Sequence, residues 1–222
     1  MPKNIEKFKF YDVIILLSPT GEKASNLKEF LHILEDATDP VVFHHLYQFH
    51  IKYHYKIWDY PNDFANWAAD SLEDQALAEK LANFDPYDFS VVSEAKENVL
   101  EIIEEHMWNL PTVPWVRDGF EFYFTSSTSI VSPLGHQAKD LRDFRNKIAK
   151  INSSSIYYHF YEARKRQKDK VNDDFSLWIE NNFDKPGLVE NIRDIDFYFY
   201  SLSEVRFKIL NLLDQELENA DT

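Results

Sequence analysis

Two stretches of the chain alternate between aromatic and polar residues and then become apolar or β-branched. They are residues 8–17 (FKFYDVIILL) and residues 120–131 (FEFYFTSSTSIV). A period of two is typical of strands, because successive side chains point to opposite faces of a sheet. We therefore expect two extended segments that pair as a small two-stranded ribbon. Such a ribbon is marginal alone and needs helices packed against it.

Apolar residues at spacings of three and four dominate the rest of the chain, which is typical of amphipathic helices. We interpret Ser18-Pro19-Thr20-Gly21 as a turn after the first extended segment. Ser25 or Asn26 is expected to cap the helix that follows, and Asp140 to cap its counterpart later in the chain.

Further helices are predicted from their start signals. Asp39-Pro40 combines an acidic cap with a proline at the first helical position, and the pattern predicts one helix from there to about Trp58. Asp63 is interpreted as the cap of a short helix anchored by Trp67. Residues 94–107 carry apolar side chains at helical spacing and close this part of the chain.

Internal repetition is the strongest signal in the sequence. Residues 41–67 (VVFHHLYQFHIKYHYKIWDYPNDFANW) recur in degraded form as residues 155–178 (SIYYHFYEARKRQKDKVNDDFSLW). The match extends to Gly21 and Gly135, which suggests a backbone need such as positive φ. We therefore expect a mainly α protein of two pseudo-symmetric helical repeats packed together, each preceded by a short extended segment. The repeats are residues 1–112 and 113–222.

A proline-containing connector, WNLPTVPWVRDG (residues 108–119), joins the two repeats. Pro111 and Pro114 disfavour helix there. Trp108 and Trp115 are too apolar for a free linker. We therefore expect the connector to be packed across the two repeats.

Composition restricts the class of protein. The chain has no cysteine, which excludes disulfides and thiolate chemistry, and no apolar run near the roughly 18 residues that a membrane span needs. The first residues lack the apolar core of a signal peptide. A formal net charge of −14 argues against general nucleic-acid binding, which requires a basic surface. We expect a soluble, cytoplasmic protein that binds neither nucleic acid nor membrane.

Histidines crowd the first copy of the repeat, at positions 44, 45, 50 and 54. His50 and His54 are four residues apart, a spacing that can chelate a metal, and Asp59 or Asp63 can add a carboxylate. The candidate ligands of one transition metal are therefore His44, His45, His50, His54 and Asp63. The aligned positions of the second copy hold Tyr158, Arg164 and Lys168, so this site would belong to one copy only.

His45 differs from the other three because its counterpart, His159, is also a histidine. One interpretation is a partly buried imidazole hydrogen-bonded to a carboxylate or carbonyl, near Asp63 in one copy and Asp174 in the other. A general base with its orienting carboxylate is the alternative. We favour the structural interpretation, because no serine or cysteine nucleophile is recognisable nearby.

Two stretches, HIKYHYK (residues 50–56) and RKRQKDK (residues 164–170), are locally cationic. Cations near a helix C-terminus are typically solvated and complement its dipole. The functional interpretation is a pair of basic patches for a phosphate or an acidic partner. Its candidate contacts are His50, Lys52, His54, Lys56, Arg164, Lys165 and Arg166. A phosphate ligand held by Arg117, Arg164 and Arg166 is disfavoured by the acidity of the chain and the missing glycine-rich loop.

The combination SPTGxxAxxL, VVFHHLYQFH, PNDFANW and LAEKLANFDPYDF, followed by SSIYYHFYEAR and NDDFSLW, resembles an uncharacterised prokaryotic family known only as a domain of unknown function. The resemblance covers about residues 8–217. It implies a bacterial or archaeal cytoplasmic protein built from a doubled unit and brings no reaction. We therefore favour a non-catalytic helical interaction or regulatory module with an unidentified protein partner and no cofactor. The alternative is a metal- or small-ligand-binding protein or enzyme that uses the histidine cluster.

Overall fold

A computed structural model describes residues 6–52 and 59–220 of the chain. The chain forms two compact lobes. The first lobe is Ile15–Thr128, and the second lobe joins Met1–Ile14 to Ser129–Thr222. This division differs from the repeat boundary expected at residues 112 and 113. The N-terminal strand segment belongs with the second lobe, whereas residues 113–128 belong with the first.

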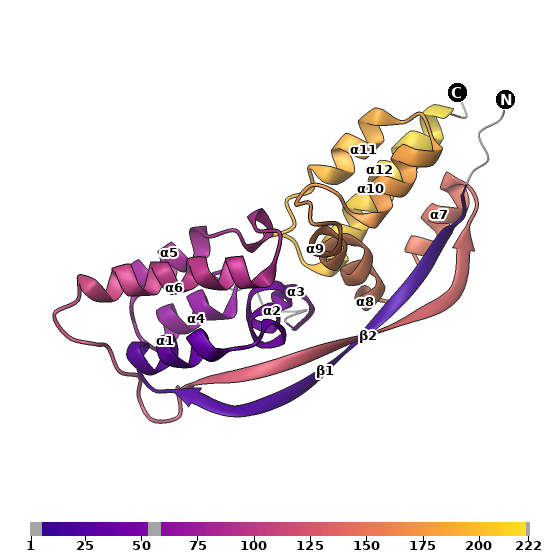
Figure 1. The fold of residues 1–222 in the computed structure, drawn as a ribbon. Helices are drawn as coiled ribbons and strands as arrows, with labels where there is room; N and C mark the ends of the chain where they lie inside the picture. Colours follow the sequence, from indigo (N-terminus) through magenta and orange to yellow (C-terminus); the bar gives the residue numbers. More distant parts are fainter. Residues whose placement is uncertain (1–5, 53–58, 221–222) are drawn as a thin grey trace. The chain divides into compact units, whose positions relative to one another are not determined.

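Helices make up most of both lobes (Figure 1). Those of the first lobe are α1 (Leu27–Asp36), α2 (Asp39–Tyr47), α3 (Phe49–Lys52), α4 (Asp63–Asp70), α5 (Gln75–Asn83), the 3₁₀ turn η1 (Pro86–Asp88) and α6 (Val92–Trp108). Those of the second lobe are α7 (Leu141–Ile148), α8 (Ser153–Ile156), the π-helical η2 (Tyr157–Glu162), α9 (Ala163–Gln167), α10 (Asp174–Asn182), α11 (Pro186–Arg193) and α12 (Leu202–Ala220).

The expected two-stranded ribbon is confirmed. It pairs β1 (Phe8–Ala24) with β2 (Phe122–Ala138), and the two arrows of Figure 1 run in opposite directions. Both strands are longer than expected, because the segments around Gly21 and Gly135 continue the strands instead of turning. The two glycines have φ of +88° and +71°, so the expected need for positive φ is confirmed while the expected turn is wrong.

Aromatic side chains of β2 fill the core of the first lobe. Phe122 and Phe124 are 6% and 2% exposed. Both contact Phe30 of α1, with ring centroids 5.0 and 5.3 Å apart. Phe122 also contacts Phe64 and Trp67 of α4. Full burial of an aromatic side chain stabilises a fold by about 1.5–3 kcal/mol, so this strand segment is an integral part of the lobe.

The corresponding residues of β1 fill the core of the second lobe in the same way. Phe8 and Phe10 are 6% and 1% exposed, and their ring centroids lie 5.1 and 5.8 Å from that of Phe144 in α7. Phe8 also contacts Phe175 and Trp178 of α10. Each lobe therefore takes its strand from the other half of the sequence.

Helix caps explain where several helices begin. Asn26 accepts a hydrogen bond from the backbone N–H of Glu29, and Asp140 does the same for Asp143, as expected. The expected cap at Asp63 is wrong by one residue. The cap of α4 is Asn62, whose side chain accepts from the N–H of Ala65.

The single helix expected from Asp39 to Trp58 is interrupted. It ends at Tyr47, and a second short helix runs from Phe49 to Lys52. Between them lies Gln48, whose fully buried side chain accepts a hydrogen bond from the ring of His44 at 2.8 Å. The remainder of the expected helix, residues 53–58, lies outside the described residues.

The connector is less buried than the sequence suggested. Trp108 is 90% exposed and Trp115 is 68% exposed. Backbone contacts hold the connector against the start of α1: the N–H of Val116 donates to Ser25 and that of Leu27 to Pro114. The two tryptophans are therefore not what holds the connector, which is fixed through its backbone instead. Among the described residues, no helix is long and apolar enough to span a membrane.

Candidate functional site

His45 connects a helix of the first lobe to strand β2. Its Nδ1 lies 2.6 Å from Oδ2 of Asp63, and its Nε2 accepts a hydrogen bond of 3.1 Å from the backbone N–H of Thr125. The imidazole is 4% exposed. Since a backbone N–H can only donate, Nε2 must carry the lone pair, and Nδ1 must carry the proton that is donated to Asp63.

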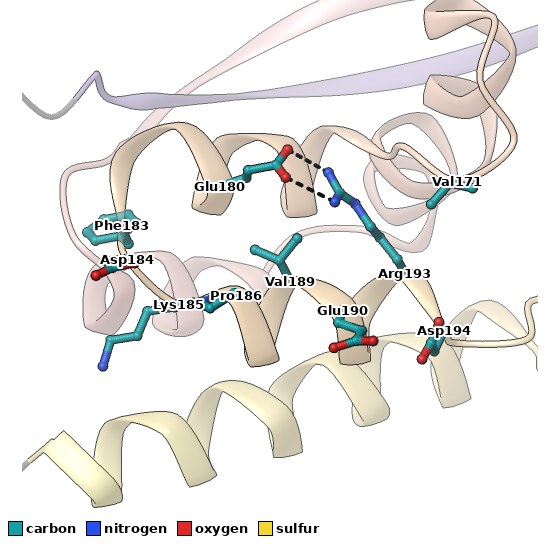
Figure 2. A pocket seen from close by; sticks show the side chains of 10 residues that line it. All are labelled: Val171, Glu180, Phe183, Asp184, Lys185, Pro186, Val189, Glu190, Arg193 and Asp194. Atoms are coloured by element: carbon teal, nitrogen blue, oxygen red, sulfur yellow. Dashed lines mark hydrogen bonds and ion pairs between the residues drawn. The ribbon is translucent and has the colours of Figure 1, made fainter.

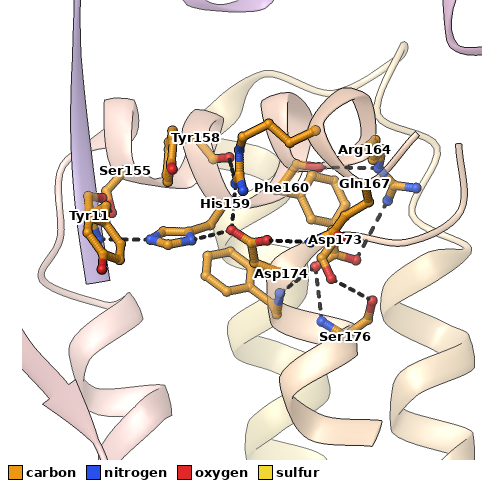
Figure 3. Close-up of polar contacts among 12 residues, drawn as sticks. Tyr11, Ser155, Tyr158, His159, Phe160, Arg164, Gln167, Asp173, Asp174 and Ser176 are labelled. Carbon is orange, nitrogen blue, oxygen red and sulfur yellow. Dashed lines mark hydrogen bonds and ion pairs between the residues drawn. The ribbon is translucent and has the colours of Figure 1, made fainter. Parts of the chain in front are cut away.

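His159 makes the same connection in the second lobe (Figure 3). Its Nδ1 lies 2.8 Å from Oδ2 of Asp174, and its Nε2 accepts a hydrogen bond of 2.9 Å from the backbone N–H of Tyr11 in β1. The ring is 2% exposed and packs against Phe8 and Phe175. The sequence-based expectation that each histidine lies beside its aspartate is confirmed.

A cation completes each pair. Nζ of Lys52 lies 2.5 Å from Oδ2 of Asp63, and a guanidinium nitrogen of Arg166 lies 2.7 Å from Oδ2 of Asp174. Arg166 also lies over the ring of Tyr158, 4.3 Å from its centroid. Each lobe thus has one chain of contacts, from cation to carboxylate to imidazole to strand amide.

The pKa shifts of the pairs agree with this geometry. Burial raises the pKa of Asp63, but the charge of Lys52 and the hydrogen bond from His45 outweigh it and hold that pKa below its ordinary value. The pKa of Asp174 is also below its ordinary value: burial raises it, but the hydrogen bond from His159 and the charge of Arg166 outweigh burial. Burial lowers the pKa of both histidines against the opposing effect of their aspartates. Both histidines are therefore neutral at pH 7.

Both nitrogens of His45 and of His159 are already used. A general base needs a free lone pair that faces a substrate proton. Here the lone pair of each imidazole accepts a strand amide. The arrangement therefore holds β1 and β2 against the helices, as a backbone-anchoring hydrogen bond does, and offers no proton acceptor to a substrate. The structural interpretation of the two histidines fits this geometry better than the catalytic one.

The structure brings only part of the proposed metal set together. One ligand atom from each of His44, His45 and Asp63 lies within 4.8 Å of the others. Nδ1 of His44 donates to Gln48, which leaves its Nε2 with a lone pair. His50 lies in α3 and is not part of this group, while His54 lies outside the described residues. Burial lowers the pKa of His44 and of His50 to about 4.

A hollow of about 510 Å³ opens beside this group in the first lobe. His44, Lys52, Asp63 and Asn66 line it, together with the exposed ring of Tyr123. Lys52, the one lysine among the described residues that line the hollow, is already paired with Asp63, so these residues offer no free positive charge to an anion. Three of the five metal-site residues proposed from the sequence, His44, His45 and Asp63, thus line this hollow.

The second cationic stretch is divided between core and surface. Arg164 is 2% exposed, and its guanidinium donates to the carbonyl groups of Lys170 and Val171 while it stacks on Phe160. It therefore closes a loop from inside and cannot contact a partner. Lys165 is half-buried and Arg166 is exposed. Lys56 of the first stretch lies outside the described residues.

Asp173 is a buried residue that sequence reasoning missed. It is fully buried and caps α10 by accepting hydrogen bonds from the N–H groups of Phe175 and Ser176 (Figure 3). Burial raises its pKa against the opposing effect of Arg164, whose guanidinium lies 3.9 Å away. Its signal in the sequence was its position before Asp174-Phe175, where the first copy has Asn62 before Asp63-Phe64.

Comparison with protein families gives a match over nearly the whole chain, residues 5–214. The chain belongs to a family of unknown function, DUF5752. The chain is also similar to a solved structure described as "The structure of OrfY from Thermoproteus tenax", with a TM-score of 0.75 and 25% sequence identity over 95% of each chain. Comparison with curated proteins finds no match. These findings support the fold and name no activity.

Proposed function

We propose that this DUF5752 protein is a non-catalytic module that binds a protein partner and regulates or positions it. The observation that carries the proposal is the use of both imidazole nitrogens of His45 and His159 in holding the strands. The residues that the two halves share most clearly thus serve the fold. A cytoplasmic, prokaryotic protein that arose by tandem duplication fits this proposal.

Exposed aromatic side chains support a role in binding. Trp108 and Trp115 are 90% and 68% exposed in the first lobe, and Phe199 and Phe207 are 80% and 65% exposed in the second lobe. Aromatic residues are enriched in protein–protein interfaces because they bury a large area at a low entropic cost. These side chains do not serve the core, and they offer apolar area for contact with another protein.

The test is reconstitution from purified components. The tagged chain is isolated from its own cells under mild conditions, and each protein recovered in stoichiometric amount is purified separately. We expect at least one of them to form a defined complex with the chain in light scattering and calorimetry, with Kd at or below the micromolar range. Failure of every purified candidate to form a complex, or a turnover that His45→Asn abolishes, would overturn the proposal.

One observation favours a second candidate function, a metal site in the first lobe. His44, His45 and Asp63 form a compact group, and the Nε2 lone pair of His44 is a suitable ligand. Binding through His45 would require it to release either Thr125 or Asp63. The test is elemental analysis of untagged protein purified without added metal or chelator. About one transition metal per chain, lost in His44→Ala and retained in the exposed control His32→Ala, would support this function.

A further inference from the structure

A groove runs beside α11 in the second lobe, opposite the C-terminal part of α10 (Figure 2). Its volume is about 460 Å³. The apolar residues that line it are Val171, Phe183, Pro186 and Val189, and the charged residues are Glu180, Asp184, Lys185, Glu190, Arg193 and Asp194. The groove is therefore apolar with a rim of charges.

Both cations of this rim are already neutralised. Arg193 forms a bidentate pair with Glu180, with N–O distances of 3.1 and 2.7 Å. Lys185 lies 2.7 Å from Glu216. Among the described residues, no cation lies within ion-pair distance of the exposed Asp184, Glu190 or Asp194. Three carboxylates thus surround the apolar groove without compensation.

The first lobe has exposed glutamates at two of the three aligned acidic positions, Glu73 and Glu79, but it differs at three other residues that line the groove. With the offset of 111 residues, Glu180, Val189 and Arg193 align with three alanines, Ala69, Ala78 and Ala82. Ala69 and Ala78 are almost fully buried, which lets α4 and α5 pack closely. The fold therefore does not require the larger side chains that the second lobe has at these three positions. Their presence at one of two similar helix pairs is explained by a binding role.

We propose that this groove binds a basic peptide segment of the partner protein, with one large apolar side chain inserted and lysine or arginine residues on either side. The proposal rests on the proposed function and specifies its partner chemistry. The inserted side chain contacts Val189 and Phe183, while the flanking cations compensate Asp184, Glu190 and Asp194. The same carboxylates repel phosphates, which excludes nucleic acid as the occupant.

The probe is a short fluorescent peptide with a central leucine flanked by lysines. Control peptides replace the leucine with alanine or the lysines with glutamates. Binding to the full chain is measured by anisotropy at about 50 and about 300 mM salt. We expect the leucine–lysine peptide to bind at least about tenfold more tightly than either control, and to weaken with salt, because both burial and charge contribute.

Two charge-matched variants locate the binding. The groove variant is Asp184→Asn, Glu190→Gln and Asp194→Asn. The control variant changes three exposed glutamates of α6 in the first lobe, Glu97→Gln, Glu101→Gln and Glu105→Gln. We expect the groove variant to lose about tenfold or more in affinity and the control to stay within about twofold of the unmodified chain. All substitutions are on exposed side chains, so both variants should fold.

Equal losses in the two variants, or equal affinity for the leucine and alanine peptides, would mean non-specific attraction to an acidic chain and would overturn the inference. If a reconstituted partner binds the groove variant as well as the unmodified chain, the groove is not its site, yet the proposed function stands. If the peptide binds at the groove while no protein partner can be reconstituted, the groove is a site for basic peptides, but the proposed function fails and so does the assignment of the peptide to a partner protein.

Discussion

His159→Asn tests whether the imidazole holds β1 in the second lobe. Asparagine can place an amide N–H near the position of Nδ1 and keep a donor for Asp174, but it is too short to accept from the N–H of Tyr11. The lost acceptor leaves a part-buried amide without a partner, at a cost of about 1–3 kcal/mol. At about 1.4 kcal/mol per factor of ten, this cost corresponds to an increase of about 5- to 150-fold in the equilibrium constant for local opening.

The assay is amide hydrogen exchange at residue resolution, which reports local opening. We expect His159→Asn to accelerate exchange at Tyr11 and to leave Thr125 unchanged, since Thr125 is bonded to His45. His45→Asn should have the reciprocal effect. His159→Gln is the matched control, because its carbonyl oxygen reaches the position of Nε2 and can restore the acceptor. Unchanged exchange at Tyr11 in His159→Asn, or equal acceleration at both amides in both variants, would refute the reasoning.

Three further predictions concern stability. The free energy of unfolding should fall as the pH decreases from about 6.5 to about 4, because His44 and His50 stay neutral in the fold while the unfolded chain binds protons. Each histidine contributes up to about 1.4 kcal/mol per pH unit. In denaturation curves, His44→Asn should therefore reduce the dependence of the unfolding free energy on pH. Asp173→Ala should cost about 1 kcal/mol more than Asp173→Asn in chemical denaturation, since asparagine retains the cap oxygen for α10. Trp178→Phe should lower the unfolding free energy by about 0.5–1.5 kcal/mol and accelerate exchange near Glu6, whose carbonyl accepts from the indole N–H at 2.6 Å.

The local elements were largely predictable from the sequence. Periods of two and of three to four located both strands and most helices, and the caps at Asn26 and Asp140 follow from side chains that accept neighbouring N–H groups. The break at Gln48 was not predictable. It lies within a continuous run of apolar and aromatic residues that carries no glycine or proline to mark it.

The candidate site was predictable in its residues and not in its connections. Repetition singled out His45 and His159 and placed each beside its aspartate. The strand amides of Thr125 and Tyr11 could not be found, since a backbone donor leaves no trace in residue identity. The burial of Arg164 was equally hidden, because a run of cations looks the same in sequence whether its members are solvated or enclosed.

The exchange of strands between the two halves determines the order in which the chain can complete its structure during synthesis. The helices of the first lobe leave the ribosome well before Phe122 and Phe124, which fill their core. Residues 6–14 are made before the helices of either lobe and must wait for His159 and Trp178, a separation of 148 residues for the bond between Tyr11 and His159. Contacts this distant in sequence slow folding. The aromatic residues of β1 therefore stay uncovered on the nascent chain until His159 and Trp178 emerge, which makes the chain vulnerable to aggregation during that interval.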